Sequence, residues 1–139
     1  MARDEQLRAA WLTIGGYIAG ADGLSTGEAE ALGRSAASPD FGFEACVELL
    51  VAAAAGGLPE DSLSAVRATE LGDTVASLIE IAHAVAVDGL SQGEWARFRE
   101  VSSRLVDEAR VEPLVRLVVA ELDARKARGE LFFESEAPA

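Results

Sequence analysis

The sequence is poor in cysteine, in histidine and in long hydrophobic runs, and each scarcity excludes a class of protein. A single cysteine, Cys46, in 139 residues rules out an internal disulfide and makes the cytoplasm the expected compartment. The most apolar stretch, residues 45–55, contains Glu48 and is too short to cross a bilayer, so no direct membrane insertion is expected. The charged first five residues are not followed by an apolar signal region, which argues against export by a cleavable signal.

Signatures of catalysis and of nucleic-acid binding are also missing. The chain has no phosphate-binding loop, no nucleophile elbow, no Cys-x-x-Cys pair and no patch of mixed basic and aromatic residues. Acidic residues outnumber basic ones 24 to 12, and the net charge of −12 repels phosphates and anionic lipid while favouring cations and basic protein surfaces. We therefore expect a non-enzymatic protein with a protein partner and no nucleic-acid ligand.

Helical periodicity runs through nearly the whole chain, and no segment alternates apolar and polar residues long enough to indicate a strand. Half of the residues are hydrophobic, which is enough for one domain of this length to bury a core. We predict an all-α, single-domain bundle of about seven helices over residues 1–128, with a flexible tail over 129–139. The predicted helices span about 7–22, 25–36, 43–55, 59 or 60–71, 74–88, 91–105 and 111–128, and Asp73 or Thr74 is expected to cap the fifth.

Two of these helices carry more detailed expectations. In the first, Leu7, Trp11, Ile14 and Ile18 fall on one stripe that should face the core. The helix over 43–55 is apolar on nearly all sides, so we expect it at the centre of the bundle.

A seven-residue segment occurs twice. Residues 22–28 read Asp-Gly-Leu-Ser-Thr-Gly-Glu and residues 88–94 read Asp-Gly-Leu-Ser-Gln-Gly-Glu, with six of seven positions identical at a separation of 66 residues. A match this dense indicates an internal duplication. We therefore predict two related helical halves about a pseudo-two-fold axis.

Each copy of the segment is expected to end one helix and begin the next. Gly23 can adopt the left-handed conformation that a helix C-terminal cap needs. The Ser25 hydroxyl can accept from the backbone N–H of Glu28 while the Glu28 side chain reaches back, which is a capping box. Ser91 and Glu94 repeat the pattern. Glycine just before each glutamate, as at Gly93, suggests that another part of the chain approaches closely there.

The two aspartates of the repeat are less well explained. Asp22 and Asp88 lie in the last turn of a helix, where a carboxylate meets the negative end of the helix dipole. They either build the corner as Asx-turns or bind a cation, and the sequence leaves both open. If the corners meet across the pseudo-two-fold axis, Asp22, Glu28, Asp88 and Glu94 would offer a divalent cation, Ca²⁺, Mg²⁺ or Mn²⁺, an all-oxygen site.

Other metal arrangements fit less well. With Gly23 at position six of an EF-hand loop, only Asp22 would be a ligand and position twelve would be Ala29, so the EF-hand register fails. Glu80-x-x-His83 resembles half of a di-iron helix motif, but it occurs once, which favours a structural histidine. The apolar neighbours of Cys46 predict an inert thiol.

The repeated segment with the small residues before it, Ala19–Glu28 and Ala84–Glu94, resembles the TerB-like family associated with tellurite resistance. The resemblance covers about residues 7–122. It implies an all-helical fold of about seven helices with internal pseudo-symmetry. Members of the family belong to stress-response systems and act as binding modules rather than enzymes, often near membranes.

The resemblance also implies metal binding at the acidic positions, which here are Asp22, Glu28, Asp88 and Glu94. Our first hypothesis is a cytoplasmic stress-response module that binds a divalent cation, a protein partner or both. The alternative is a structural scaffold or adaptor without metal, whose acidic corners only cap helices and whose tail docks on a partner. The sequence specifies neither the partner nor the oligomeric state.

Overall fold

The chain is helical almost throughout the part that the structure describes. The computed structural model describes residues 3–37, 42–67, 69–86 and 89–132. These residues contain no strand, which confirms the prediction of an all-α protein. The elements in chain order are α1 (Arg3–Ala19), the 3-10 turn η1 (Gly20–Asp22), α2 (Thr26–Ala36), α3 (Phe43–Ala55), α4 (Glu60–Arg67), α5 (Leu71–Val85), α6 (Gln92–Leu105) and α7 (Glu108–Phe132).

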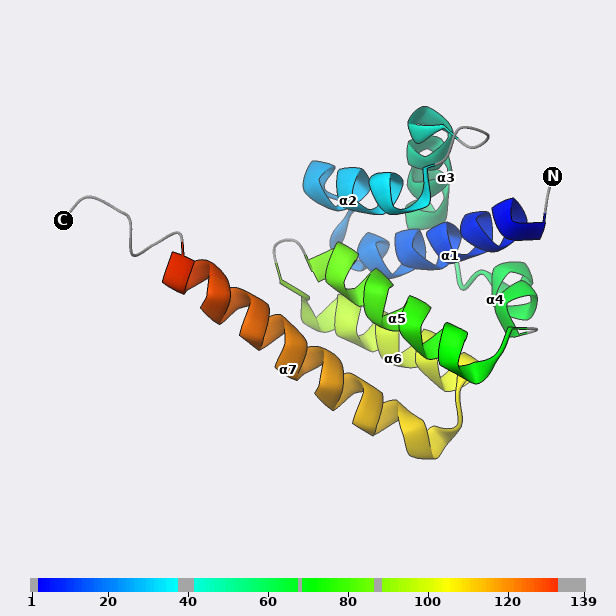
Figure 1. Ribbon diagram of the computed structural model, residues 1–139. Helices are drawn as coiled ribbons and strands as arrows, with labels where there is room; N and C mark the ends of the chain where they lie inside the picture. The colour runs from blue at the N-terminus through cyan, green and yellow to red at the C-terminus, as the bar shows by residue number, and fades with distance from the viewer. Residues whose placement is uncertain (1–2, 38–41, 68, 87–88, 133–139) are drawn as a thin grey trace.

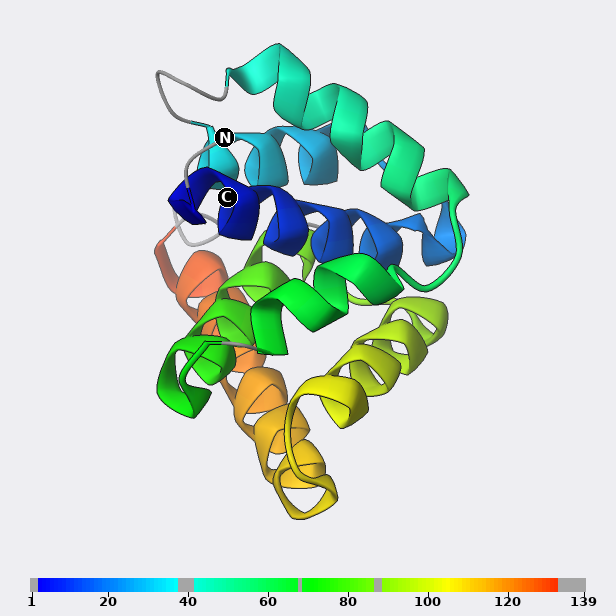
Figure 2. The same cartoon turned by 90° about the vertical axis from the view of Figure 1, so that its right-hand side faces the viewer.

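Helix α1 runs through the middle of the molecule (Figure 1). It contacts α2, α3, α4, α5 and α6. In Figure 2, α2 and α3 lie above α1, while α5, α6 and α7 lie below it. Ile14 and Ile18 of the predicted stripe are fully buried, whereas Leu7 and Trp11 are partly buried at the edge of the core. The core therefore forms around α1.

The prediction that the third helix lies at the centre is wrong. Helix α3 buries only Cys46 and Leu50, while Val51 is 57% exposed. It packs one face against glycines of the first helical segment: a Cβ on Gly20 would lie 2.5 Å from the carbonyl oxygen of Ala54. The small residues that make α3 apolar on all sides give it a close contact on one side, not burial on every side.

Several helix boundaries also differ from the prediction. Helix α5 begins at Leu71 with Glu70 at the N-cap, not at Asp73 or Thr74. Thr74 is instead buried in the first turn, where its hydroxyl contacts the Thr69 hydroxyl at 2.7 Å and donates to the carbonyl oxygen of Glu70. A threonine that can bond back to the preceding turn need not cap the helix.

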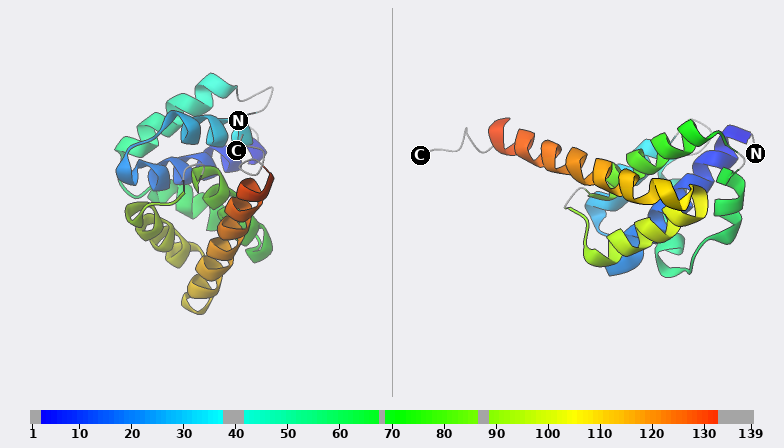
Figure 3. Two further views of the ribbon diagram at one scale, coloured as in Figure 1. Left: turned by 90° about the vertical axis from the view of Figure 1, so that its left-hand side faces the viewer. Right: turned by 90° about the horizontal axis from the view of Figure 1, so that it is seen from below.

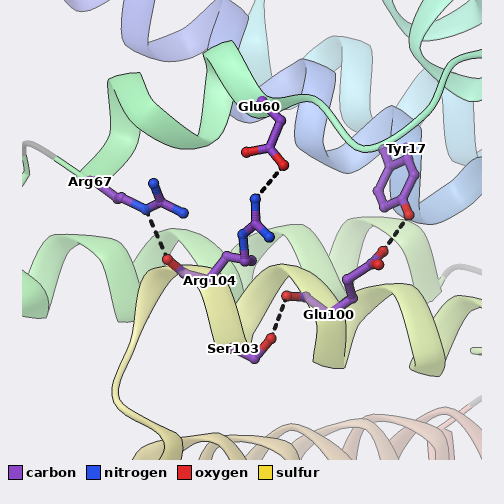
Figure 4. A network of polar contacts seen from close by, with 6 residues as sticks. All are labelled: Tyr17, Glu60, Arg67, Glu100, Ser103 and Arg104. Atoms are coloured by element: carbon purple, nitrogen blue, oxygen red, sulfur yellow. Dashed lines mark hydrogen bonds and ion pairs between the residues drawn. The ribbon is translucent and has the colours of Figure 1, made fainter.

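Polar contacts join α6 to α4 and α1 (Figure 4). Arg104 pairs with Glu60, and the Arg67 Nε–H donates to the Arg104 carbonyl oxygen at 3.0 Å. Further along α6, Glu100 accepts a hydrogen bond from the Tyr17 hydroxyl. These contacts fix the orientation of α6 against the first half of the chain, and this orientation positions the site described below.

Helix α7 packs on α5 and α6 through Val111, Leu114, Val115 and Val118. Its last turns project beyond the other helices (Figures 1 and 3). The helix continues to Phe132, four residues past the predicted end at Arg128. Within the described residues no single helix is both long and apolar enough to cross a bilayer; α3 and α4 reach that length only as a pair bent by 117°.

Candidate acidic site at the repeated helix corners

Both copies of the repeated segment form the predicted capping box. The Ser25 and Ser91 hydroxyls each accept from the backbone N–H of the glutamate three residues on, at 3.1 Å. The Glu28 and Glu94 carboxylates accept from the serine backbone N–H at 3.0 and 2.9 Å. One oxygen of each glutamate is therefore held at the start of its helix, and both side chains have a fixed direction.

The glycines that precede these caps are required by the backbone. Gly23 and Gly89 have φ of 90° and 88°, and no other described residue has positive φ. At Gly23 ψ is 144°, so the residue is extended rather than left-handed helical as predicted. This region is close to one that is essentially restricted to glycine. The corner thus demands glycine more strictly than a common helix cap does.

The two corners, distant in sequence, lie together in space. In Figure 2 the end of α1 lies directly above the start of α6, and η1 contacts α6. A Cβ on Gly93 would lie 3.2 Å from the Asp22 carboxylate and 3.3 Å from the Cβ of Ala21. The atoms that approach Gly93 closely therefore belong to side chains of the other corner and not to another backbone.

At this contact the carboxyl group of Glu28 lies near enough to that of Glu94 to raise its pKa. The two residues are 7% and 6% exposed, which makes them the only buried acidic side chains among the described residues. Burial, with the proximity and charge of the Glu28 carboxyl group, raises the pKa of Glu94 from 4.5 to about 7, against the lowering effect of the hydrogen bonds from Ser91. Two adjoining carboxylates repel each other, so the pair holds a proton near neutral pH.

The structure places only two of the four predicted ligands together. Glu28 and Glu94 are together, and Asp22 is exposed beside Gly93, next to Glu94 in sequence. Asp88 lies outside the described residues. Among the described residues no three His, Cys, Asp or Glu side chains converge as a metal ion requires. What the structure places at the site is a buried carboxyl pair that can exchange a proton and that presents oxygen ligands.

Glu28 and Glu94 were expected at one site as cation ligands, if the two corners met. Their pairing as interacting carboxyl groups was not expected, because each was accounted for by its own capping box. The nearest sequence signal is the glycine before each glutamate, because a helix start needs no glycine at that position. At Gly93 this glycine leaves room for Ala21 and Asp22 of the other corner.

The other two candidate residues, His83 and Cys46, take part in the packing of the fold. His83 Nε2 contacts the Glu121 carboxylate at 2.8 Å, and Arg125 on α7 donates to the His83 carbonyl oxygen at 2.9 Å. The histidine therefore joins α5 to α7, in line with the structural interpretation. Cys46 is fully buried, and burial raises the pKa of its thiol, as expected of an inert cysteine.

Each of the two tryptophans borders a cavity at the edge of the core. Trp11 borders a cavity of about 460 Å³ between α1, α2 and α5, together with Leu32 and Ile81. Trp95 borders one of about 500 Å³ between α6 and α7, where Lys126 also lies. Both rings are partly buried against the core. Neither cavity includes the carboxyl pair.

Comparison of the chain with models of known protein families, with curated proteins and with solved structures yields no match.

Proposed function

We propose that this chain is a TerB-like, non-enzymatic binding module of the cytoplasm that takes up a divalent cation, Ca²⁺, Mg²⁺ or Mn²⁺, at its repeated acidic corners. The observation that supports this most directly is the pair of buried, interacting carboxyl groups of Glu28 and Glu94. A carboxyl pair that must hold a proton can hold a cation in its place, because either positive charge relieves the repulsion. Asp22 and Asp88 are the additional ligands in this proposal, supplied by the two corners of the duplicated sequence.

The first experiment is calorimetric titration of the protein with Ca²⁺, Mg²⁺ and Mn²⁺, with the melting temperature measured in parallel. Binding at 100 times Kd should stabilise the fold by about 2.7 kcal/mol. Repeating the titration at pH 7 in buffers of different ionisation enthalpy counts the protons released, and displacement of the shared proton predicts up to one per cation.

The variants Asp22→Asn/Asp88→Asn and Glu28→Gln/Glu94→Gln should each lose most of the binding heat. Asp61→Asn/Asp73→Asn is the matched control, since both aspartates are exposed and lie on other helices. No heat from any of the three metals, with a melting temperature unchanged at saturating metal, would reject the metal part of the proposal.

The second candidate function is a scaffold or adaptor that needs no metal. It is favoured by the end of α7, where Leu131 is 65% exposed on a helix that projects beyond the other helices (Figure 3). Here the capping boxes only shape the corners, and the C-terminal residues contact a protein partner. Deletion of residues 129–139 should then abolish partner recovery and leave the melting temperature nearly unchanged. Retained recovery would count against this function.

A further inference from the structure

Helix α7 has two apolar faces, and only one of them packs on the protein. The packed face carries the buried residues named above. The other face carries apolar residues at alternating spacings of four and three, all of them exposed: Pro113, Leu117, Ala120, Ala124, Ala127 and Leu131. We call these six residues the α7 seam. Leu117 and Leu131 in the seam are 45% and 65% exposed, among the most exposed large hydrophobic residues of the structure.

The 4-3-4-3-4 spacing is the heptad pattern of a coiled coil. Residues at such spacing form one continuous stripe along a helix and bury it against a second helix with the same pattern. With Leu117, Ala124 and Leu131 at the a positions, the seam covers a and d from residue 113 to 131. The buried residues Val115 and Val118 then fall at f and b, away from the seam, while the buried Leu114 falls at e, on its flank. The seam residues themselves stay exposed, with the e side next to the packed face.

The last turns of α7 are mostly exposed, although Arg125 donates to the carbonyl oxygens of His83 and Ala86. From Asp123 to Leu131 every residue except Gly129 is exposed, and these turns project past the other helices in Figure 1 and Figure 3. Isolated helices shorter than about 12–15 residues are marginal in water. Gly129 costs the helix about 1 kcal/mol more relative to alanine. A second helix along the seam would supply the missing packing.

Charge singles out α7 as the place where a second copy of this chain can approach. The whole chain carries −12, so two copies repel each other over most of their surfaces. Helix α7 carries five acidic and five basic residues and is therefore neutral. Five of the 12 basic residues of the protein lie on this one helix.

The charges that flank the seam complement each other in parallel register. Arg116 and Asp123 fall at g positions, and Glu121 and Arg128 fall at e positions. In a parallel coiled coil, each g residue faces the e residue of the next heptad on the other helix. Arg116 would face the partner's Glu121, and Asp123 would face the partner's Arg128. All four contacts of a symmetric pair join opposite charges, and the two that use Glu121 would add to the contact of its carboxylate with His83 of the same chain.

We propose that two copies of this chain associate through parallel pairing of their α7 seams. The pairing uses no residue of the acidic corners. A test of the dimer is therefore independent of a test of metal binding. Three of the six seam residues are alanines and bury little area, so the dimer should be reversible and should depend on concentration.

Sedimentation equilibrium of the full chain tests the pairing. The expected result is a monomer–dimer equilibrium. Ala124→Glu places a charge at the centre of the seam and should weaken the dimer at least tenfold, with the helical circular dichroism of the monomer retained. Ala96→Glu on α6 is the matched control, an exposed alanine away from the seam, and should leave the equilibrium unchanged. A chain that stays monomeric at about 1 mM, or a dimer that Ala124→Glu does not weaken, overturns the proposal.

A charge swap tests the parallel register. Asp123→Arg opposes like charges at two symmetric contacts and should weaken the dimer, while Asp123→Arg/Arg128→Asp should restore it. A single variant without effect, or a double variant weaker than the single one, would overturn the parallel pairing.

Discussion

Glu28 and Glu94, the last residues of two sequence copies 66 positions apart, are both buried, and the carboxyl group of Glu28 helps to raise the pKa of Glu94. Each is also the side chain that closes the capping box of its own helix. The same residue therefore begins a helix and joins the two corners. This double use ties the stability of the protein to the protonation of one site.

The first prediction concerns pH. Because the pKa of Glu94 rises from 4.5 to about 7 on folding, the folded state binds its proton more tightly than the unfolded chain does. The stabilising contribution is complete below about pH 4.5 and is lost as pH rises to about 7 and beyond. Its full size is on the order of 3–4 kcal/mol, since one pKa unit corresponds to about 1.4 kcal/mol. Urea unfolding across pH 5 to 8 measures it.

The variant Glu94→Gln should remove this part of the pH dependence and stabilise the protein at pH 8. The amide oxygen can still accept from the Ser91 N–H, while the amide N–H₂ can donate to Glu28 without repulsion. Glu44→Gln, at an exposed glutamate of α3, serves as the control. If the free energy of unfolding of Glu94→Gln depended on pH as steeply as that of the wild type, the shared-proton interpretation would be contradicted.

The two capping serines, although small, should contribute measurably to the free energy of unfolding. Ser25→Ala or Ser91→Ala removes the acceptor for a helix N–H and should lower the free energy of unfolding by about 1 kcal/mol each. Ser64→Ala, at an exposed serine in α4, is the control and should stay near the wild-type value. Equal effects from all three substitutions would speak against the capping role.

Close packing of α3 depends on glycine. In Gly20→Ala the new Cβ would lie 2.5 Å from the Ala54 carbonyl oxygen and 2.7 Å from its Cα, so the backbone must shift. We expect destabilisation of about 1–3 kcal/mol in urea unfolding. Gly72→Ala is the opposite case, because no atom lies within 4 Å of its Cβ, and alanine should stabilise α5 by up to about 1 kcal/mol. If Gly72→Ala were destabilised as well, the destabilisation of Gly20→Ala could not be attributed to its contact with Ala54.

The docking of α7 depends on one arginine. Arg125 donates to the carbonyl oxygens of His83 and Ala86 at 2.9 and 2.8 Å, where the carbonyls of α5 lack helical partners. Arg125→Ala should cost about 1–2 kcal/mol and increase hydrogen exchange in the second half of α7. Lys126→Ala, the adjacent position without these bonds, should leave exchange unchanged.

Much of the secondary structure could be predicted from sequence because its causes are local. The Ser-x-x-Glu boxes located the starts of α2 and α6, and the apolar periodicity located the helices between the corners. Prediction was poorer where a local signal had two outcomes. Thr74 can cap a helix or bond back within one, and the packing of its turn selected the second.

The same distinction between local causes and tertiary packing applies to the candidate site. The sequence by itself determined the two corners: the positive φ of Gly23 and the capping bonds of Glu28 involve atoms only a few residues apart. Only the tertiary structure decided that α3 lies at the edge and that Glu28 contacts Glu94. These relationships depend on how closely distant helices approach and cross, and that approach is set by the packing of the whole chain around α1. Local capping preferences carry no information about the distance between two corners.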